Sequence, residues 1–379
     1  MATKTNQKNN QNSSPKRKIS AREHEARKRR KFVIFGVEIV VILAMVAVLY
    51  VVMTKTNDNG PTTTYLAPEN LAIPEQVKQE SEDENGSMHG YINIALFGVD
   101  ARKDDELYRG SRSDSTMIAS VNVDTGDIRL VSVYRDTYLN LSNDTYDKCN
   151  GAYSYGGAEQ AVKMLNMNLD MDITKFITVG YQGLSEVIDG LGGVYIEVDS
   201  EELKHINNYQ INIAEALNCS YTPVTQTGYQ LLNGLQATAY CRIRYTAGDD
   251  FKRTARQREV LKAIEDQAKQ ADYATLVKVF NNSIDDIYTN LDTEDIMALL
   301  ENISHYSIVE EGGFPQEDMR TTANLGAKGS CVIPLDLESN VVWLHQFLFD
   351  DDNYQVTSTV QEISAKVESD TRNYINKNN

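Results

Sequence analysis

The chain has 379 residues, 41% of them hydrophobic, and a formal net charge of -17 at pH 7. This length and composition exclude a wholly disordered protein and are sufficient for one large or two ordinary domains with a substantial core. The acidic balance also argues against nucleic-acid binding through the general field of the protein, although a local basic cleft can still hold a phosphate.

The N-terminal segment differs from the rest of the chain in charge. Residues 1–31 carry eleven Lys or Arg and only two acids, Glu23 and Glu25, and they contain no apolar run. We expect a disordered basic tail here.

An apolar run follows the tail. Residues 32–53, FVIFGVEIVVILAMVAVLYVVM, are enough for one helix to cross a bilayer. Because the basic cluster from Arg27 to Lys31 precedes the run, the positive-inside tendency keeps the N-terminus in the cytoplasm. The sequence therefore predicts a single-pass protein of the cell membrane with an extracellular C-terminal part. A cleaved signal peptide is the competing interpretation, but no small-x-small cleavage site directly follows the run.

Residues 54–89 are rich in Thr, Asn, Pro, Glu and Ser, which favours an extracellular stalk or linker, with folded structure beginning near Gly90. Beyond it, strands and helices alternate, which predicts an α/β fold with a mixed sheet flanked by helices. The expected strands are residues 91–99, 117–123, 128–134, 176–181 and 194–198, with a hairpin turn at 124–127. The expected helices are residues 158–169, 183–189, 251–269, 273–280 and 293–303, and a stretch around 344–349.

Residues 240–260, YCRIRYTAGDDFKRTARQREV, hold five arginines and one lysine. Alternation over residues 239–245 favours a strand that points Arg242 and Arg244 the same way. A helix from about Phe251 then places Arg253, Arg256 and Gln257 on one face. Because the guanidinium fork matches phosphate oxygens, this pattern indicates phosphate binding, whereas a solvated helix face is the plainer alternative.

Two aspartates stand at the ends of neighbouring predicted strands. Asp100 closes one strand and Asp114 precedes the next, so their carboxylates are candidates to share Mg²⁺ with substrate phosphates. Turn capping or pairing with Arg102 or Arg112 is the alternative. Arg135 and Asp136 follow a third strand at the same kind of strand end.

The four cysteines, at positions 149, 219, 241 and 331, all lie beyond the apolar run and lack C-x-x-C spacing. We therefore expect one or two disulfides rather than a zinc site, with the pairing open.

Seven separated motifs resemble those of the LytR-CpsA-Psr (LCP) family, in the family order and over roughly residues 90–270. They are Gly98-Val99-Asp100-Ala101-Arg102, Arg112-Ser113-Asp114, Arg135-Asp136-Thr137, Asn150-Gly151-Ala152-Tyr153 with Gly156-Gly157, Leu232-Asn233-Gly234 with Ala237 and Ala239, Arg242-Ile243-Arg244, and Asp250-Phe251-x-Arg253-x-x-Arg256-Gln257. Two departures are Tyr134, where the family often has proline, and Lys148-Cys149-Asn150 in place of a lysine-apolar-asparagine motif.

The resemblance implies an LCP-type α/β/α catalytic domain over residues 90–272. It also implies a membrane-anchored phosphotransferase that moves a phosphoglycan, such as a teichoic acid or capsular polysaccharide, from a polyprenyl-pyrophosphate carrier to peptidoglycan. Residues 273–379 carry no motif and are expected either to complete the sheet or to cover the site.

The family resemblance also implies residue roles. Asp100 and Asp114 would hold Mg²⁺, and Asp250 would orient the arginines. The implied pyrophosphate-binding residues are Arg135, Arg242, Arg244, Arg253 and Gln257. Further expected contacts to the substrate come from Arg102, Arg112, Lys148 and Arg256.

The chemistry of phosphoryl transfer agrees with these roles, because arginines and a metal can supply most of the charge stabilisation without a covalent nucleophile. Asp136, Asp249 and Asp250 are candidates for the general base. Apolar faces within residues 173–181 and 187–198 are candidates for a lipid tunnel, with ordinary core as the alternative. Hydrolysis of the carrier pyrophosphate and non-catalytic binding of a lipid-linked glycan remain alternative functions, and transcriptional regulation ranks last because no helix-turn-helix is visible.

Overall fold

The computed structural model describes residues 66–101, 107–244 and 249–375. The predicted membrane helix at residues 32–53 and the basic tail before it lie outside these ranges. Among the helices that are described, none is both long and apolar enough to span a membrane.

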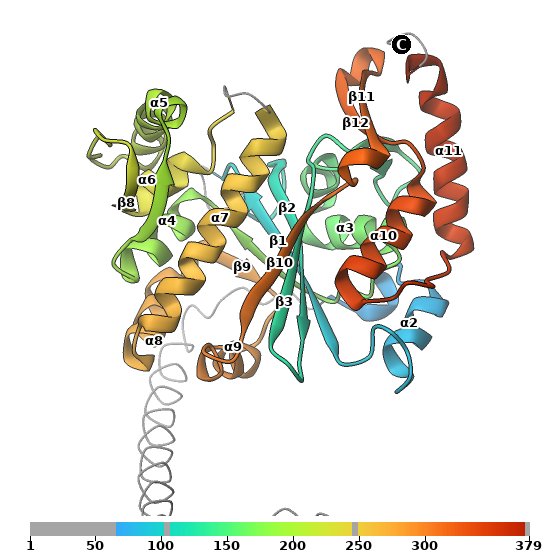
Figure 1. Cartoon of the computed structure of the whole chain (residues 1–379), viewed down its shortest axis with the longest axis horizontal. Coiled ribbons are helices and arrows are strands. Elements are labelled where there is room, and N and C mark those ends of the chain that lie inside the picture. The colour runs from blue at the N-terminus through green and yellow to red at the C-terminus, as the bar shows by residue number, and fades with distance from the viewer. Residues whose placement is uncertain (1–65, 102–106, 245–248, 376–379) are drawn as a thin grey trace, which may run out of the picture. The chain divides into compact units, whose positions relative to one another are not determined.

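A six-stranded mixed sheet forms the centre of the fold (Figure 1). Its strand order is β10-β3-β2-β1-β6-β9, with parallel pairing of β1 with β6 and of β10 with β3 and antiparallel pairing elsewhere. The strands are β1 (Tyr91–Val99), β2 (Ser113–Asn122), β3 (Asp127–Val133), β6 (Lys175–Val179), β9 (Ile287–Thr289) and β10 (Ser307–Phe314).

Apolar side chains on both faces of the sheet explain the helical layers. In β1, Ala95 and Phe97 belong to the largest core cluster, while Leu96 on the opposite face packs against the cluster that contains Met117 and Leu130. Because side chains alternate along a strand, this strand needs cover on both sides.

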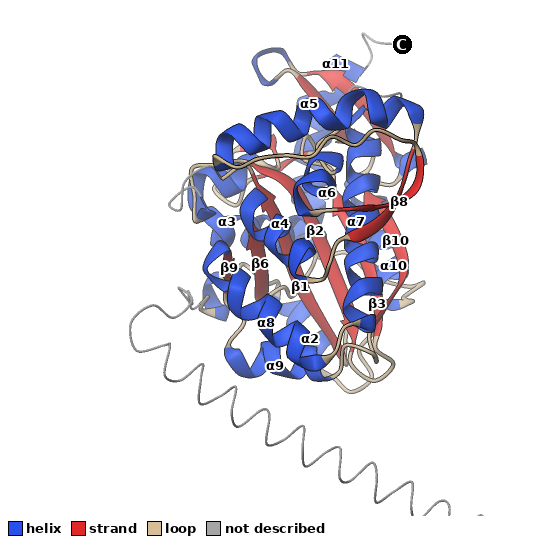
Figure 2. Ribbon diagram, turned by 90° about the vertical axis from the view of Figure 1, so that its left-hand side faces the viewer, coloured by secondary structure: helices blue, strands red, loops and turns tan. Residues whose placement is uncertain are grey.

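One layer of helices packs on each face, as the two perpendicular views show (Figures 1 and 2). The first layer contains α2 (Glu75–Glu82), α3 (Gly151–Leu169), α10 (Leu337–Phe349) and α11 (Ser358–Ile375). The second contains α4 (Tyr181–Gly190), α6 (Gly234–Tyr240), α7 (Asp249–Gln270) and α8 (Tyr273–Ser283), with α9 (Thr293–Glu301) beside α8. The predicted α/β class with a mixed sheet between helices is confirmed.

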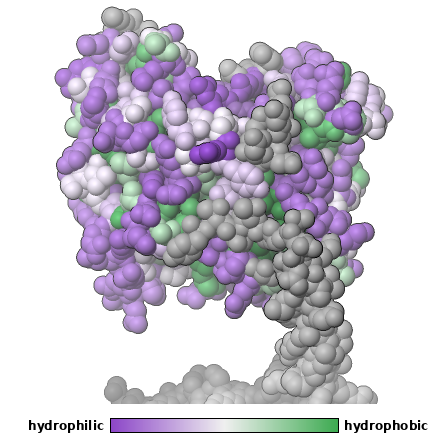
Figure 3. All heavy atoms as spheres, turned by 180° about the vertical axis from the view of Figure 1, so that it is seen from behind, coloured by the Kyte–Doolittle hydropathy of each residue, from purple (hydrophilic) through white to green (hydrophobic). Residues whose placement is uncertain are grey.

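Smaller elements complete the fold. Outside the second layer lie α5 (Ser200–Leu217) and the ribbon of β7 (Val194–Val198) and β8 (Gly228–Leu232). On the side of the first layer are the pairs β4 (Tyr138–Asn140) with β5 (Tyr146–Lys148) and β11 (Arg320–Asn324) with β12 (Ser330–Pro334). The face seen from behind is mostly hydrophilic, with its apolar side chains in small separate patches (Figure 3).

The folded part begins earlier than the composition suggested. Within the segment expected as a linker, Leu71, Val77 and Met88 are fully buried in the largest core cluster. The Asn166 side chain also donates to the Leu71 carbonyl at 3.0 Å. Three apolar residues spaced through a polar stretch carry little periodic signal, yet they anchor residues 66–89 to the domain.

The strand predicted over residues 239–245 is wrong. The Asn233 side chain accepts a hydrogen bond from the Gln236 backbone and Gln236 accepts one from the Asn233 backbone, so a capping box starts α6 at Gly234. The helix ends at Tyr240, and Arg242 and Ile243 donate to backbone carbonyls three residues earlier. Burial still alternates along this segment although it is not a strand, because Ile243 is fully buried while Arg242 is only half-buried.

The expected disulfides are absent, since all four cysteines are described and all are free. Cys149, Cys241 and Cys331 are buried, whereas Cys219 is exposed. The buried three fill core positions as small apolar groups.

The C-terminal third completes the central sheet, which was one of the two expected alternatives. β9 and β10 form its two edges, and residues of α10 and α11 belong to the largest core cluster. Residues 90–272 and 273–379 are therefore parts of one compact unit, which extends over residues 61–379.

Candidate functional site

Charged side chains gather at one end of the central strands, which we call the sheet edge that carries the site. β1 and β3 end and β2 begins at this edge, because β2 runs antiparallel to both neighbours. The segment after α6 and the first turn of α7 bring further charges to the same edge. The charged cluster consists of Asp100, Asp114, Arg135, Asp136, Lys148, Arg242, Arg244, Asp250 and Arg253.

A β-bulge presents Asp114 to this cluster. Gly98 pairs with Ser115 and Val99 with Ser113, which leaves Asp114 as the additional residue of β2. Bulges next to active sites re-aim a side chain in this way. Ser113 is buried and accepts a hydrogen bond from the Thr116 hydroxyl at 3.0 Å, which holds the bulged segment in place.

Asp114 is shared by two arginines. Arg135 pairs with it directly, and the Arg244 guanidinium lies 3.8 Å from the same carboxylate oxygen. Neighbouring Asp100 lies 3.7 Å from Arg242, so the two aspartates at adjacent strand ends each face a different arginine of the Arg242-Ile243-Arg244 segment. The predicted alternation of these arginines thus brings both to the sheet edge.

A second acidic pair lies on the side of α7. Asp250 is 3.0 Å from Arg253 and 3.7 Å from Arg244, while Asp136 is 3.2 Å from Lys148 and 3.6 Å from Arg135. Asp136 is also one of the charged groups that act on Asp250. Desolvation raises the pKa of Asp250, Arg253 and Arg244 lower it, and Asp136 raises it again, with a net increase.

Arg253 is the most deeply buried charge of the cluster. Its side chain is only 2% exposed, and none of its three guanidinium nitrogens makes an aligned hydrogen bond within the protein. Burial lowers the pKa of Arg253, although Asp250 opposes that shift. A buried guanidinium with unsatisfied donors is expensive unless an anion supplies the acceptors. The site therefore has the chemistry of an anion-binding centre.

Arg256 has a different environment from the other arginines. It is almost fully buried and donates to Glu202 at 2.8 Å and to the Ile243 carbonyl at 3.1 Å. Through the Ile243 carbonyl it fixes the backbone between Arg242 and Arg244. These contacts give Arg256 a positioning role.

The other expected substrate contacts fall into three groups. Lys148 belongs to the charged cluster through Asp136. Gln257 holds its side-chain oxygen buried without a hydrogen-bond partner, whereas Arg112 is exposed. Arg102 lies outside the described residues, as does the side chain of Asp249.

Tyr181 is a member of the site that the motifs did not reveal. Its ring lies 4.4 Å beneath the Arg242 guanidinium, and its hydroxyl lies close to Asp100. Burial raises the pKa of Tyr181, so the phenol remains protonated and neutral. Its only sequence signal was its place at the start of α4, where the chain leaves β6 at the same sheet edge.

Arg320 is a second missed residue, contributed by β11 in the C-terminal third. Its guanidinium stacks 4.1 Å above the Phe251 ring and 4.8 Å above the Tyr134 ring. The two rings meet edge to face with centroids 4.7 Å apart, and Arg320 also donates to the Pro315 carbonyl at 2.9 Å. We call Tyr134, Phe251 and Arg320 the aromatic clamp.

The aromatic clamp requires the departure from the family pattern at position 134. Tyr134 stands where proline is frequent, and its phenol passes so close to Gly313 that an added Cβ there would lie 2.0 Å from the phenol oxygen. The clamp joins Tyr134, next to Arg135, to Phe251, next to Asp250. It thereby ties the two halves of the charged cluster together.

The residues present fit a magnesium ion. No group of three or more metal-ligating side chains occurs among the residues that the structure describes, but Asp100 and Asp114 supply two carboxylates at adjacent strand ends. Magnesium commonly binds through one or two carboxylates and takes its remaining ligands from water and substrate phosphates.

Comparison with known proteins identifies a family for this chain. A model described as the LytR_cpsA_psr family matches residues 59–328, well over half of the chain. The chain belongs to the LytR_cpsA_psr family. The family assignment made from the seven motifs is thereby confirmed.

Relatives within the LytR_cpsA_psr family carry transferase names. The chain is 28% identical over 299 residues to the polyisoprenyl-teichoic acid–peptidoglycan teichoic acid transferase TagT of Bacillus subtilis, covering 77% of this chain and 87% of TagT. It is 30% identical over 237 residues to the transferase TagU of Enterococcus faecalis, covering 61% and 69%. The crystal structure of Bacillus subtilis TagV superposes with a TM-score of 0.56 at 24% identity, covering 70% of this chain and 98% of that one, which supports the fold.

We predict that Arg320→Gln weakens the binding of inorganic pyrophosphate about tenfold, because Phe251 and the first turn of α7 lose their support against Tyr134. Titration calorimetry measures the affinity. Arg372→Gln is the matched control, because Arg372 is 63% exposed and forms an ion pair with Glu368 of the same helix. Equal pyrophosphate affinities for the two variants would contradict a role of the aromatic clamp in the site.

We also predict a pH signature for Asp250. Its folded-state pKa is raised, so between its ordinary value of about 4 and the raised value the folded chain holds a proton that the unfolded chain has lost. This contribution to stability is complete below about pH 4 and disappears as the pH rises through the folded-state pKa. Asp250→Asn cannot titrate at this position, so its free energy of unfolding, relative to that of wild type, should increase as the pH rises. Denaturant unfolding at a series of pH values tests this, and parallel profiles for the two proteins would refute it.

Proposed function

We propose that this chain transfers a phosphate-linked glycopolymer from a polyprenyl-pyrophosphate carrier to peptidoglycan. The observation that carries the proposal is the buried Arg253 guanidinium, which lies 3.0 Å from Asp250 but makes no aligned hydrogen bond within the protein, in a cluster of five cationic and four acidic side chains. A pyrophosphate supplies the acceptors that this cluster lacks. Transfer to peptidoglycan is inferred from the names of TagT and TagU.

In the proposed reaction, a hydroxyl of the acceptor attacks the phosphorus on the glycan side of the pyrophosphate. The new P–O bond forms as the bond to the bridging oxygen breaks, and polyprenyl phosphate leaves. Charge develops on the phosphoryl and leaving oxygens, where Arg135, Arg244 and Arg253 stabilise it. The ion pairs with Asp114 and Asp250 hold these guanidinium groups in place before substrate arrives.

Magnesium is part of this proposal. Asp100 and Asp114 would hold it, and when bound it would neutralise charge on the pyrophosphate oxygens. Arg242 is held between Asp100 and the Tyr181 ring, which orients its donors beside the same oxygens.

The proton of the attacking hydroxyl needs an acceptor. Asp136 and Asp250 are the candidate bases that belong to the charged cluster, and the raised pKa of Asp250 brings it nearer to the range in which a base accepts a proton effectively. We assign the base to this pair.

We further infer that residues 32–53 anchor the chain in the cell membrane with the folded part outside. The apolar run and the basic cluster before it support this orientation. Exposed Cys219 gives a direct test, because a membrane-impermeant maleimide should label it on intact cells. Labelling only after lysis would exclude an extracellular domain.

Transfer itself should depend on both halves of the charged cluster. With a lipid-linked glycan, magnesium and peptidoglycan fragments, we expect wild type to form a phosphodiester-linked conjugate that mass spectrometry detects. Asp114→Asn and Arg244→Lys should each lower the rate at least about 100-fold, and a chelator should do the same. Arg372→Gln, far out on α11, should retain the rate.

Other products of this assay would identify other functions. Release of the glycan phosphate into solution, with or without peptidoglycan, would indicate a hydrolase. A glycan that stays on its lipid while the protein still binds it would indicate a non-catalytic carrier.

A further inference from the structure

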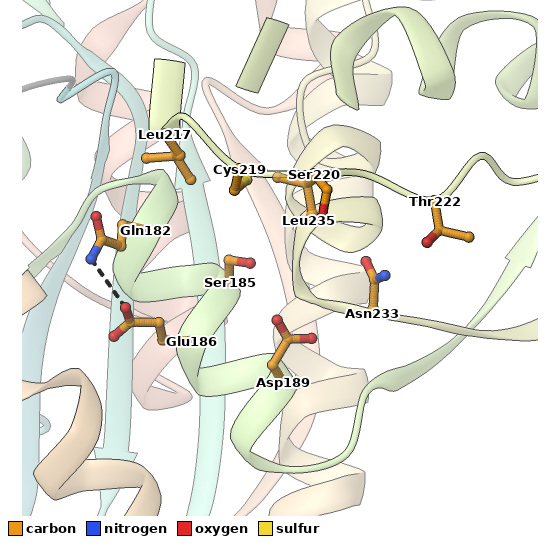
Figure 4. Close-up of a pocket in the computed structure, with 10 residues that line it drawn as sticks. All are labelled: Gln182, Ser185, Glu186, Asp189, Leu217, Cys219, Ser220, Thr222, Asn233 and Leu235. Carbon is orange, nitrogen blue, oxygen red and sulfur yellow. Dashed lines mark hydrogen bonds between the residues drawn. The ribbon is translucent and has the colours of Figure 1, made fainter. Parts of the chain in front are cut away.

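A cavity of about 510 Å³, open to solvent, lies between α4, the start of α6 and the segment that follows α5 (Figure 4). Its size falls within the range of ordinary small-molecule sites. None of the charged-cluster residues lines it. The charged cluster and the cavity are therefore separate sites.

Helix α4 connects the two sites. Tyr181 at its first position faces Asp100 and Arg242, whereas Ser185, Glu186 and Asp189 line the cavity. Successive residues of a helix are about 100° apart, so Ser185 and Asp189 project about 40° and 80° away from Tyr181, and Glu186 about 140°. The cavity is thus on the adjacent face of the helix that carries Tyr181, within about two turns of it.

The lining is suited to hydroxyl and amide groups. The side chains of Ser185, Asp189 and Asn233 face a common space in Figure 4, with Thr222 opposite. Asp189 is held in place because one of its carboxylate oxygens accepts a hydrogen bond from the Gly234 backbone at 2.7 Å. These groups offer both donors and acceptors, while Leu235 adds an apolar surface.

The charge and polarity of the lining disfavour both the phosphoglycan and its polyprenyl carrier as ligands. Glu186 and Asp189 are acidic, and no lysine or arginine lines the cavity. Carboxylates disfavour a polyanionic phosphoglycan, and the polar lining disfavours a polyprenyl chain. What remains is an uncharged, hydroxyl-rich and amide-bearing ligand.

We propose that this cavity binds the N-acetylhexosamine glycan of the peptidoglycan acceptor. This assignment rests on the proposed function, because that function requires an uncharged glycan next to the phosphate-binding site. The cavity holds the acceptor beside α4, the helix whose first residue, Tyr181, faces Asp100 and Arg242.

Cys219 provides a selective probe of the cavity, which it lines. It is the only exposed cysteine of the four. Burial raises the pKa of Cys149 and Cys241 to about 12 and that of Cys331 to about 11, so these three thiols react poorly. A maleimide therefore modifies Cys219 selectively and places its adduct in the cavity.

The experiment measures glycan binding by the full chain in detergent, before and after labelling with N-ethylmaleimide. The probes are an oligomer of N-acetylglucosamine and, separately, inorganic pyrophosphate with magnesium. We expect labelling to weaken glycan binding at least about tenfold and to leave pyrophosphate binding unchanged. Cys219→Ser treated with the same reagent should bind both probes as the untreated protein does, and Glu186→Lys, which needs no labelling, should also weaken glycan binding.

Each other result overturns the assignment. Glycan binding that is undetectable, or that is the same in labelled and unlabelled protein, excludes an acceptor site here. Loss of pyrophosphate binding on labelling would assign the cavity to the carrier instead. If the glycan binds as expected while the transfer assay gives no conjugate, the proposed function fails and the glycan site stands.

Discussion

The structure depends on keeping several guanidinium groups close together, one of which, that of Arg253, is buried. Arg135, Arg244 and Arg253 would repel one another at the sheet edge if Asp114 and Asp250 did not lie between them. The carboxylates reduce this repulsion but leave Arg253 without aligned hydrogen bonds. The cluster is therefore neutralised in part and still offers donors to an anion, which is the balance that the proposed function requires.

The surrounding fold supplies the rigidity that this balance needs. A bulge aims Asp114, the Arg256–Glu202 ion pair fixes the backbone between two arginines, and the aromatic clamp ties the first turn of α7 to the end of β3. Glu202 itself is held by the capping box at the start of α5. These contacts come from segments far apart in the chain, so the arrangement of the arginines reflects the packing of the whole domain rather than one loop.

Much of this could be predicted from local sequence, and the failures have physical causes. Alternating apolar residues located β1, β2 and β3, and the Arg242-Ile243-Arg244 alternation correctly brought two arginines to one site although the segment is not a strand. The capping residues Asn233 and Gln236 decide that outcome, because their capping box starts a helix at Gly234 whatever periodicity follows it. Leu71 lies in a polar stretch, and Arg320 is 69 positions after Phe251 in the sequence. Neither could be assigned, because their roles depend on tertiary contacts.

The placement of β10 and Arg320 has a consequence for how the protein is made. β10 is an edge strand of the central sheet, and Arg320 follows it in the chain. During synthesis, all seven motifs emerge before either of them. An unfinished chain therefore carries every side chain of the charged cluster but has an open sheet edge and an unsupported first turn of α7. Premature termination shortly after residue 270 would leave the motifs intact and the site unassembled, so the presence of the motifs in a truncated gene does not imply an active product.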